Sequence, residues 1–226
     1  RRRVAPMGGD RHVDAARRVY DAAAVAYVDF VGTELSDATE DVVDLSMLDG
    51  FIQLVRSVDA VGKVADLGCG PGRAAAYVAR HLSDVVGVDL SSELLLHAAR
   101  AHPDLPFAQG RLDELPFADD TLCGVVCWYS IIYTPPSRLA PILDELARVT
   151  VVDGLVLLAF QAGSGEAVVK DDAHATGLEL TAYLHDVHDI RDRLDAAGLE
   201  VHAYAVREPS RPHETSRQAF VIARAT

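Results

Sequence analysis

The stretch from residue 63 to residue 91 constrains the fold more than any other part of this chain. It opens on a short apolar run, Val64-Ala65-Asp66-Leu67, and continues through glycines at positions 68, 70 and 72 into a helical pattern. A second apolar run then ends at Asp89. A glycine turn between a buried strand and a helix brings bare backbone and free N–H groups against a ligand. The layout therefore predicts an α/β fold with a nucleotide-type site, in which Asp89 faces two ribose hydroxyls.

The spacing of the glycines separates two kinds of nucleotide site. Dinucleotide dehydrogenases use G-x-G-x-x-G, whereas this chain has Gly68-x-Gly70-x-Gly72. The string Asp-Leu-Gly-Cys-Gly-Pro-Gly of residues 66–72 resembles the first motif of class I S-adenosylmethionine-dependent methyltransferases. The resemblance implies S-adenosylmethionine as cofactor and S-adenosylhomocysteine as its product. It places cofactor contacts at the loop and after the second strand, namely Asp66, Gly68, Cys69, Gly70, Asp89 and Leu90.

A second motif covers residues 110–117, Gly-Arg-Leu-Asp-Glu-Leu-Pro-Phe. It resembles the family's Gly-Asp-Ala-x-x-Leu-Pro-Phe element, whose polar side chain and next backbone amide read the adenine edge. Here Arg111 stands where an aspartate is usual, and an arginine has no acceptor for the adenine amino group. The amide of Leu112 can still serve the ring nitrogen. For the amino group, either Asp113 replaces the missing acceptor or another group does.

The N-terminal region shows one clear helix, over residues 12–31, with apolar residues at three- and four-residue steps. Its Tyr20-Asp21 and Tyr27 resemble a Tyr-Asp…Tyr element that caps the cofactor and lines the substrate cavity in this family. We expect Tyr27 at the cofactor and Tyr20 at the substrate, with plain core packing as the alternative for each ring. Residues 33–46 are acidic and predict a surface loop, followed by a helix over residues 48–58.

The fourth predicted strand, residues 121–127, ends in an aromatic sequence. Ligands of such sheets bind outside the carboxyl ends of the strands, so Trp128, Tyr129 and Tyr133 are candidate substrate-pocket residues. Aromatic rings also suit the partial positive charge of a methyl group in transfer. Metal-dependent catechol-type relatives carry an aspartate at this strand end, where Trp128 stands here, so no metal is expected.

The remaining pattern completes the expected architecture. Helices are predicted over residues 92–101, 137–149 and from an N-cap at Asp186, and strands over 155–160, 199–206 and 218–225. The fold class is a doubly wound, Rossmann-like mixed sheet with a C-terminal antiparallel hairpin and an N-terminal helical cap. We expect a single domain with a cap at residues 10–60, a cofactor-binding core at 61–160, a lid-like insertion at 161–182, and a C-terminal helix and hairpin at 183–226.

A general base is needed only if the acceptor atom carries a proton. His185, placed just before the last helix, is the candidate for that role. His185 and His188 do not predict a metal site, because a third ligand at sensible spacing is absent.

The composition of the chain limits the kinds of molecule that it is expected to bind and the compartment in which it is expected to lie. The chain of 226 residues carries 21 Lys and Arg against 34 Asp and Glu, a net charge of −13, which disfavours nucleic acid. It has no apolar run long enough to span a membrane and no signal-peptide pattern, and its three cysteines lack metal spacing. We therefore expect a cytoplasmic protein with reduced thiols. It is expected to be a monomer or a homodimer, and Met7 is a candidate for the natural start.

These observations favour an enzyme that transfers a methyl group from S-adenosylmethionine to a small organic acceptor, neutral or cationic, of the quinone-biosynthesis type. The acceptor can be an oxygen, nitrogen or carbon atom. Two alternatives stay open, an NAD(P)-dependent oxidoreductase and a non-catalytic protein that binds S-adenosylmethionine.

Overall fold

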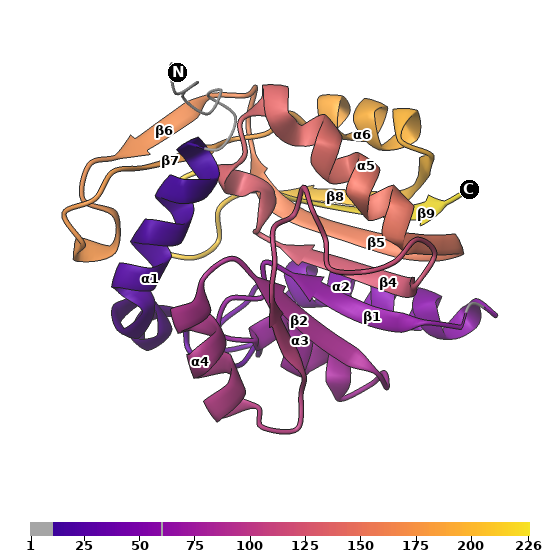
Figure 1. Cartoon of the computed structure of the whole chain (residues 1–226). Helices are drawn as coiled ribbons and strands as arrows, with labels where there is room; N and C mark the ends of the chain where they lie inside the picture. Colours follow the sequence, from indigo (N-terminus) through magenta and orange to yellow (C-terminus); the bar gives the residue numbers. More distant parts are fainter. Residues whose placement is uncertain (1–10, 60) are drawn as a thin grey trace, which may run out of the picture.

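The computed structural model describes residues 11–59 and 61–226, so the expectation for Met7 lies outside the described residues. A mixed sheet of seven strands forms the centre of the molecule, in the order β3-β2-β1-β4-β5-β9-β8 (Figure 1). Its strands are β1 (Lys63–Leu67), β2 (Val85–Asp89), β3 (Phe107–Gln109), β4 (Leu122–Trp128), β5 (Thr150–Ala162), β8 (Leu199–Arg207) and β9 (Arg217–Ala225). The first five run parallel, and β9 is antiparallel to both of its neighbours. The predicted doubly wound sheet with a C-terminal antiparallel hairpin is confirmed.

Helices cover both faces of this sheet. They are α1 (Arg11–Val31), α2 (Val42–Ser57), α3 (Arg73–Ala79), α4 (Ser92–Ala101), α5 (Leu139–Val149) and α6 (Val187–Ala196), with short 3₁₀ turns η1 (Ile131–Tyr133), η2 (Pro136–Arg138) and η3 (Ala173–Ala175). One core layer joins α5 and α6 to the sheet, and the other joins α2 and α3 to the opposite face. Parallel strands buried on both faces need continuous apolar sequence, as β4 has. No helix within the described part of the chain is long and apolar enough to cross a membrane.

Local capping signals fix several helix starts. Ser91 accepts a hydrogen bond from the Leu94 amide at the start of α4. Asp186 accepts from the His188 and Asp189 amides at the start of α6, as the sequence predicts. The stretch at residues 33–46 differs from the expected surface loop, because Asp41 caps α2 and the helix begins at Val42.

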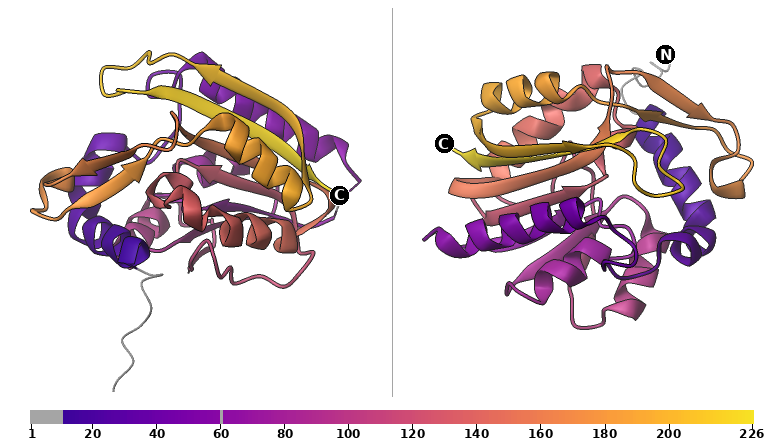
Figure 2. Two further views of the ribbon diagram at one scale, coloured as in Figure 1. Left: turned by 90° about the horizontal axis from the view of Figure 1, so that it is seen from above. Right: turned by 180° about the vertical axis from the view of Figure 1, so that it is seen from behind.

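Residues 161–182, expected to form a loop-like lid, contain regular structure. β5 extends to Ala162, and β6 (Ala167–Lys170) pairs with β7 (Leu180–Tyr183) as a separate antiparallel hairpin. The apolar residues Ala173 and Leu180 of this segment are buried against Ala16 and Val19 of α1. The hairpin and α1 therefore lie side by side at one end of the molecule, above the carboxyl ends of the parallel strands (Figure 2).

Candidate functional site

The loop after β1 forms the floor of a cavity. Gly68 has φ of +76°, and a Cβ on it would lie 2.2 Å from the Cβ of Ser130, so only glycine fits beside the end of β4. Gly70 has φ of +52°, and nothing lies closer to the position of its Cβ than Tyr27, at 3.9 Å. Both glycines line the cavity, which therefore has bare backbone as part of its wall.

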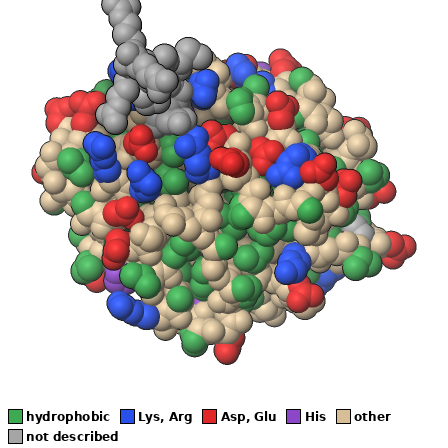
Figure 3. Space-filling view, viewed as in Figure 1, with side chains coloured by type: hydrophobic (Ala, Val, Ile, Leu, Met, Phe, Trp, Pro, Cys, Tyr) green, Lys and Arg blue, Asp and Glu red, His purple; other side chains and the backbone are tan. Residues whose placement is uncertain are grey.

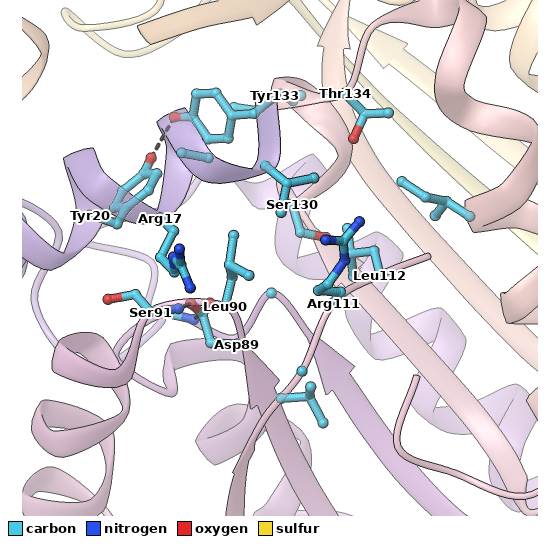
Figure 4. Close-up of a pocket in the computed structure, with 18 of the residues that line it drawn as sticks. Arg17, Tyr20, Asp89, Leu90, Ser91, Arg111, Leu112, Ser130, Tyr133 and Thr134 are labelled. Carbon is cyan, nitrogen blue, oxygen red and sulfur yellow. Dashed lines mark hydrogen bonds between the residues drawn. The ribbon is translucent and has the colours of Figure 1, made fainter. Parts of the chain in front are cut away.

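Asp89 faces the same cavity from the end of β2 (Figure 4). Its Oδ2 accepts a hydrogen bond from the Gly70 amide at 2.7 Å, and its Oδ1 accepts from the Ser91 amide at 2.8 Å. Burial raises the pKa of Asp89, and these backbone donors oppose the rise. Each carboxylate oxygen can accept two hydrogen bonds, so both retain capacity for a ribose hydroxyl. The pairing of this acid with a backbone-lined loop fits an adenosine cofactor.

Asp66 and Cys69, the other predicted contacts of the loop, do not line this cavity. Asp66 is 1% exposed, and its Oδ2 accepts a hydrogen bond from the Ala75 amide at 2.8 Å, which holds the first turn of α3. Its Oδ1 has no partner among the described residues. Burial raises the pKa of Asp66 to about 7 and raises that of the Cys69 thiol well above its usual range. Both side chains are buried and lie outside the lining of the cavity, and their direct contact with a cofactor stays a prediction.

The segment after β3 contributes Arg111, Leu112 and Asp113 to the lining of this cavity, and Leu90 after β2 also lines it. Arg111 and Asp113 form a two-pronged ion pair, with Nε–Oδ1 and Nη2–Oδ2 distances of 2.9 Å. The hydrogen bonds to Arg111 lower the pKa of Asp113, which therefore stays a carboxylate. Arg111 thus orients the carboxylate of Asp113, the residue that the sequence offers as an acceptor in place of the usual aspartate at position 111. A hydrogen bond from the adenine amino group to Asp113 stays a prediction.

Three tyrosines and the end of β4 separate this cavity from a second one. The hydroxyls of Tyr20 and Tyr133 are hydrogen-bonded to each other, and the Tyr20 and Tyr27 rings meet edge to face at 5.0 Å. Tyr129 follows Trp128 with φ of +60°, a conformation that is uncommon for a bulky residue and is often found at functional sites. The residues shared by both cavities are Tyr20, Tyr27, Trp128, Tyr129, Ile132 and Tyr133. All four predicted substrate-pocket residues, Tyr20, Trp128, Tyr129 and Tyr133, are thus brought together.

The second cavity, of about 430 Å³, contains charged residues that the sequence did not single out. Glu40, Asp44, Arg73, Arg211 and Glu214 line it. Glu40 and Asp44 lie in the stretch for which the sequence predicts a surface loop. Arg73 stands directly after the third glycine, which is the one local signal that could have drawn attention to it.

His185 lies away from both cavities. It is 1% exposed, and its Nε2 lies 3.2 Å from the Ile131 carbonyl oxygen. Burial lowers the pKa of His185. A general base must reach the acceptor atom, and the linings of the two cavities do not include His185, so we do not assign it that role. In the described part of the chain, no group of three or more His, Cys, Asp and Glu side chains is arranged to hold a metal ion.

Comparison with known proteins relates part of the chain to one class of enzyme. Residues 64–154 match the family model described as a methyltransferase domain. The matched segment is less than half of the chain and includes the glycine loop and Asp89, so this part of the chain is similar to methyltransferase domains. S-adenosylmethionine is the cofactor of that family.

The sequence relatives are more specific. The chain is 33% identical over 130 residues to a demethylmenaquinone methyltransferase of Beutenbergia cavernae, a match that covers 54% of this chain and 52% of that protein. It is 30% identical over 157 residues to the demethylmenaquinone methyltransferase of Renibacterium salmoninarum, covering 66% and 60%. A malonyl-[acyl-carrier protein] O-methyltransferase of Erwinia billingiae is 35% identical over 97 residues, covering 43% and 38%. The matches thus span about two-fifths to three-fifths of these curated relatives.

Solved structures share the fold over nearly the whole chain. Magnesium protoporphyrin IX methyltransferase from Synechocystis, solved with bound S-adenosylhomocysteine, has a TM-score of 0.69 at 18% identity, covering 95% of this chain and 100% of that one. The [4+2]-cyclase SpnF has a TM-score of 0.69 at 17% identity, covering 93% and 95%. At these identities the likeness concerns the fold, which hosts more than one kind of chemistry.

Proposed function

We propose that this protein transfers the methyl group of S-adenosylmethionine to a small organic acceptor. The observation that carries the proposal is the placement of Asp89, whose carboxylate faces the cavity beside the bare backbone of Gly70. We assign ribose to Asp89, adenine to the surface between Leu90 and Leu112, and the sulfur end to the space over Gly68 and Tyr27. The acceptor then lies beyond the shared tyrosines.

The cofactor supplies a methyl group on a positively charged sulfur, activated without help from a metal. When bound, the cofactor would supply this methyl group to a lone pair of the acceptor, with the electron pair of the broken carbon–sulfur bond left on sulfur and any acceptor proton released to water. The chain contributes alignment and exclusion of water, which can lower a barrier by roughly 7–11 kcal/mol in well-oriented cases. The rings of Tyr20, Trp128 and Tyr133 supply an electron-rich wall for the methyl group.

The relatives suggest a quinone-type acceptor, and the second cavity adds polar and charged groups to the wall that would meet it. Figure 3 shows acidic and basic side chains interspersed on the face that it displays. We propose only that the acceptor is a small organic molecule, which is methylated on an oxygen, nitrogen or carbon atom. The cytoplasmic location and the oligomeric state stay predictions.

Ligand titration tests the proposal. S-adenosylhomocysteine should raise the melting temperature of the purified protein, and NAD should not, because only a ligand of the folded state stabilises it. Asp89→Asn should weaken S-adenosylhomocysteine about 10- to 100-fold in calorimetry, since it loses charge-assisted bonds to the ribose. Glu93→Gln, an exposed carboxylate on α4, serves as the control.

Unchanged affinity of Asp89→Asn would move the ribose to another group, and stabilisation by NAD alone would refute the cofactor. Mass spectrometry of a metabolite extract incubated with protein and isotopically labelled cofactor then identifies the acceptor. Cofactor binding without any labelled product would favour the non-catalytic alternative.

A further inference from the structure

Two glutamines lie side by side on the wall of the second cavity. Gln161 of β5 and Gln218 of β9 are direct partners in the antiparallel pair of strands, and both line the cavity. Side chains of directly opposite residues project from the same face of a sheet, with Cβ atoms about 4.5–5.5 Å apart. The neighbouring pair on that face, Ala159 and Phe220, is fully buried in the apolar core. The apolar face of the sheet therefore ends in two carboxamides where the cavity opens.

The carboxamide of Gln218 is held in one orientation. The residue is 2% exposed, and its Nε2 donates a hydrogen bond to the Ser216 carbonyl oxygen at 2.8 Å. Only the nitrogen of a carboxamide can donate to a carbonyl oxygen, so this bond fixes which end of the amide is which. No described residue donates to Gln218 Oε1, and this oxygen is not enclosed by the protein. It therefore favours a ligand that donates a hydrogen bond to it.

The carboxamide of Gln161 is available as a whole. The side chain forms no hydrogen bond with the described residues, whereas the backbone carbonyl oxygen accepts one from the His185 amide at 2.9 Å. The backbone position of Gln161 is thus fixed, and its side chain offers two donors and an acceptor to the cavity.

The charged side chains of this wall are engaged with one another. Arg207 donates two hydrogen bonds to each of Asp44 and Glu214, and Arg73 pairs with Glu40 at 2.6 Å. A neutral ligand leaves none of these carboxylates without its guanidinium partner. The two amides can therefore select a ligand by its neutral hydrogen-bonding groups.

The order of the strands sets the distance between the amides and the cofactor. The sulfur end of the cofactor is assigned to Gly68 after β1, and β4, β5 and β9 follow β1 in that order across the sheet. Neighbouring strands are about 4.8 Å apart, so β5 and β9 lie roughly 10–14 Å from β1. A flat molecule of one or two rings spans this gap, with the aromatic side chains of Trp128 and Tyr129 beside it.

We propose that Gln161 and Gln218 determine the acceptor specificity of this protein. Gln218 Oε1 accepts a hydrogen bond from a hydroxyl or amino group of the acceptor, and the Gln161 carboxamide donates to a second oxygen of the same molecule. The inference rests on the proposed function and deepens it, because it names the class of acceptor. That class is a neutral, flat molecule with a hydrogen-bond donor at the end remote from the cofactor. A carboxylate has no such donor at neutral pH and would bring negative charge against Gln218 Oε1.

Two ring compounds that differ in one O–H group test the proposal. The probes 4-methoxy-1-naphthol and 1,4-dimethoxynaphthalene share both rings and both oxygens, and only the first can donate. We expect the wild type, saturated with S-adenosylhomocysteine, to bind the naphthol at least about tenfold more tightly in calorimetry. Gln218→Met keeps the length of the side chain without the acceptor oxygen, so the preference should fall to about twofold or less. Gln161→Met should weaken both probes by a similar factor of about five, because both carry the second oxygen.

Gln53→Met is the matched control, because Gln53 is exposed on α2 and lies outside the lining of both cavities. It should keep the preference of the wild type. The preference is a ratio measured on one protein, so a smaller folded fraction cannot imitate its loss.

Three results would overturn the inference and leave the proposed function standing. They are equal affinities or no binding of the two probes in the wild type, a preference that survives in Gln218→Met, and tighter binding of 1-naphthoate than of 4-methoxy-1-naphthol. If S-adenosylhomocysteine itself did not bind the wild type, the proposed function would fail together with this inference.

Discussion

At the scale of single residues, Gly68 shows how the site depends on the absence of one carbon atom. Its φ of +76° and the 2.2 Å that would separate its Cβ from that of Ser130 both exclude a larger side chain. Ser130 follows Tyr129, whose backbone is also left-handed. The two chain segments therefore hold one another at the point where the sulfur of the cofactor is expected.

Gly68→Ala should destabilise the protein by at least about 2 kcal/mol, because the added methyl group meets Ser130 and the backbone favours glycine. Gly50→Ala is the matched control, since Gly50 lies inside α2 with nothing within 4 Å of its Cβ position. That exchange should instead stabilise by about 0.5–1 kcal/mol. Urea denaturation of both variants checks the pair. Equal effects of the same sign would contradict the packing argument.

At the scale of elements, one ion-pair cluster joins the C-terminal hairpin to α2. Arg207, at the end of β8, pairs with Asp44 of α2 at 2.6 Å and with Glu214 of the β8–β9 loop at 2.6 Å. The side chains of Arg207, Asp44 and Glu214 are 9%, 2% and 9% exposed. The same loop reaches the turn before α2 through a hydrogen bond from Ser210 to Asp41. These contacts form one wall of the second cavity.

Arg207→Ala should cost about 3–5 kcal/mol of unfolding free energy, because it leaves two buried carboxylates without their partner. Arg224→Ala offers a comparison in the adjacent strand β9, where Arg224 pairs with the exposed Asp153 at 3.5 Å. This surface pair should contribute about 0–1 kcal/mol. Chemical denaturation measures both values. A similar loss of unfolding free energy in the two variants would show that the buried ion pairs of Arg207 stabilise the protein no more than the exposed pair of Arg224.

At the scale of the whole molecule, buried carboxyl groups should make stability depend on pH. Asp66 has a pKa of about 7 in the folded protein, above the ordinary value near 4 in an unfolded chain. Its stabilising contribution is complete below about pH 4 and is lost as the pH rises through 7. Burial works to raise the pKa of Glu214, but hydrogen bonds from Arg207 and from backbone amides outweigh it and lower the pKa to about 2. That contribution is present above the ordinary pKa of glutamate, near 4, and is lost as the pH falls through 2.

Asp66→Asn removes the first of these titrations. The wild type should lose stability relative to Asp66→Asn between pH 4 and pH 7, by about 1.4 kcal/mol for each unit of difference between the folded and unfolded pKa. Denaturation curves of both proteins over this range test the expectation. A difference that does not vary with pH would mean that the carboxyl group of Asp66 titrates normally in the folded state. Unchanged affinity for S-adenosylhomocysteine in Asp66→Asn would also remove this residue from the cofactor contacts.

The sequence by itself determined the central elements and the acid of the site. The loop of residues 68–72, the strand that ends at Asp89 and the caps at Ser91 and Asp186 depend on neighbouring residues, and local patterns encode them. The sequence does not predict the start of α2 or the hairpin of β6 and β7, because acidic and glycine-containing stretches have the local signature of loops whether or not they pack against other elements.

The tertiary structure alone decided which distant side chains meet. Tyr20 and Tyr133 are 113 residues apart in the chain, Asp44 and Arg207 are 163 apart, and Glu40 reaches Arg73 across 33 residues. No local pattern encodes such pairs, since a charged residue in a polar stretch has the same sequence signature whether it is solvated or paired in a cavity wall. The folded sheet brings these segments together at the carboxyl ends of its strands, and burial there turns ordinary surface residues into the boundary of the second cavity.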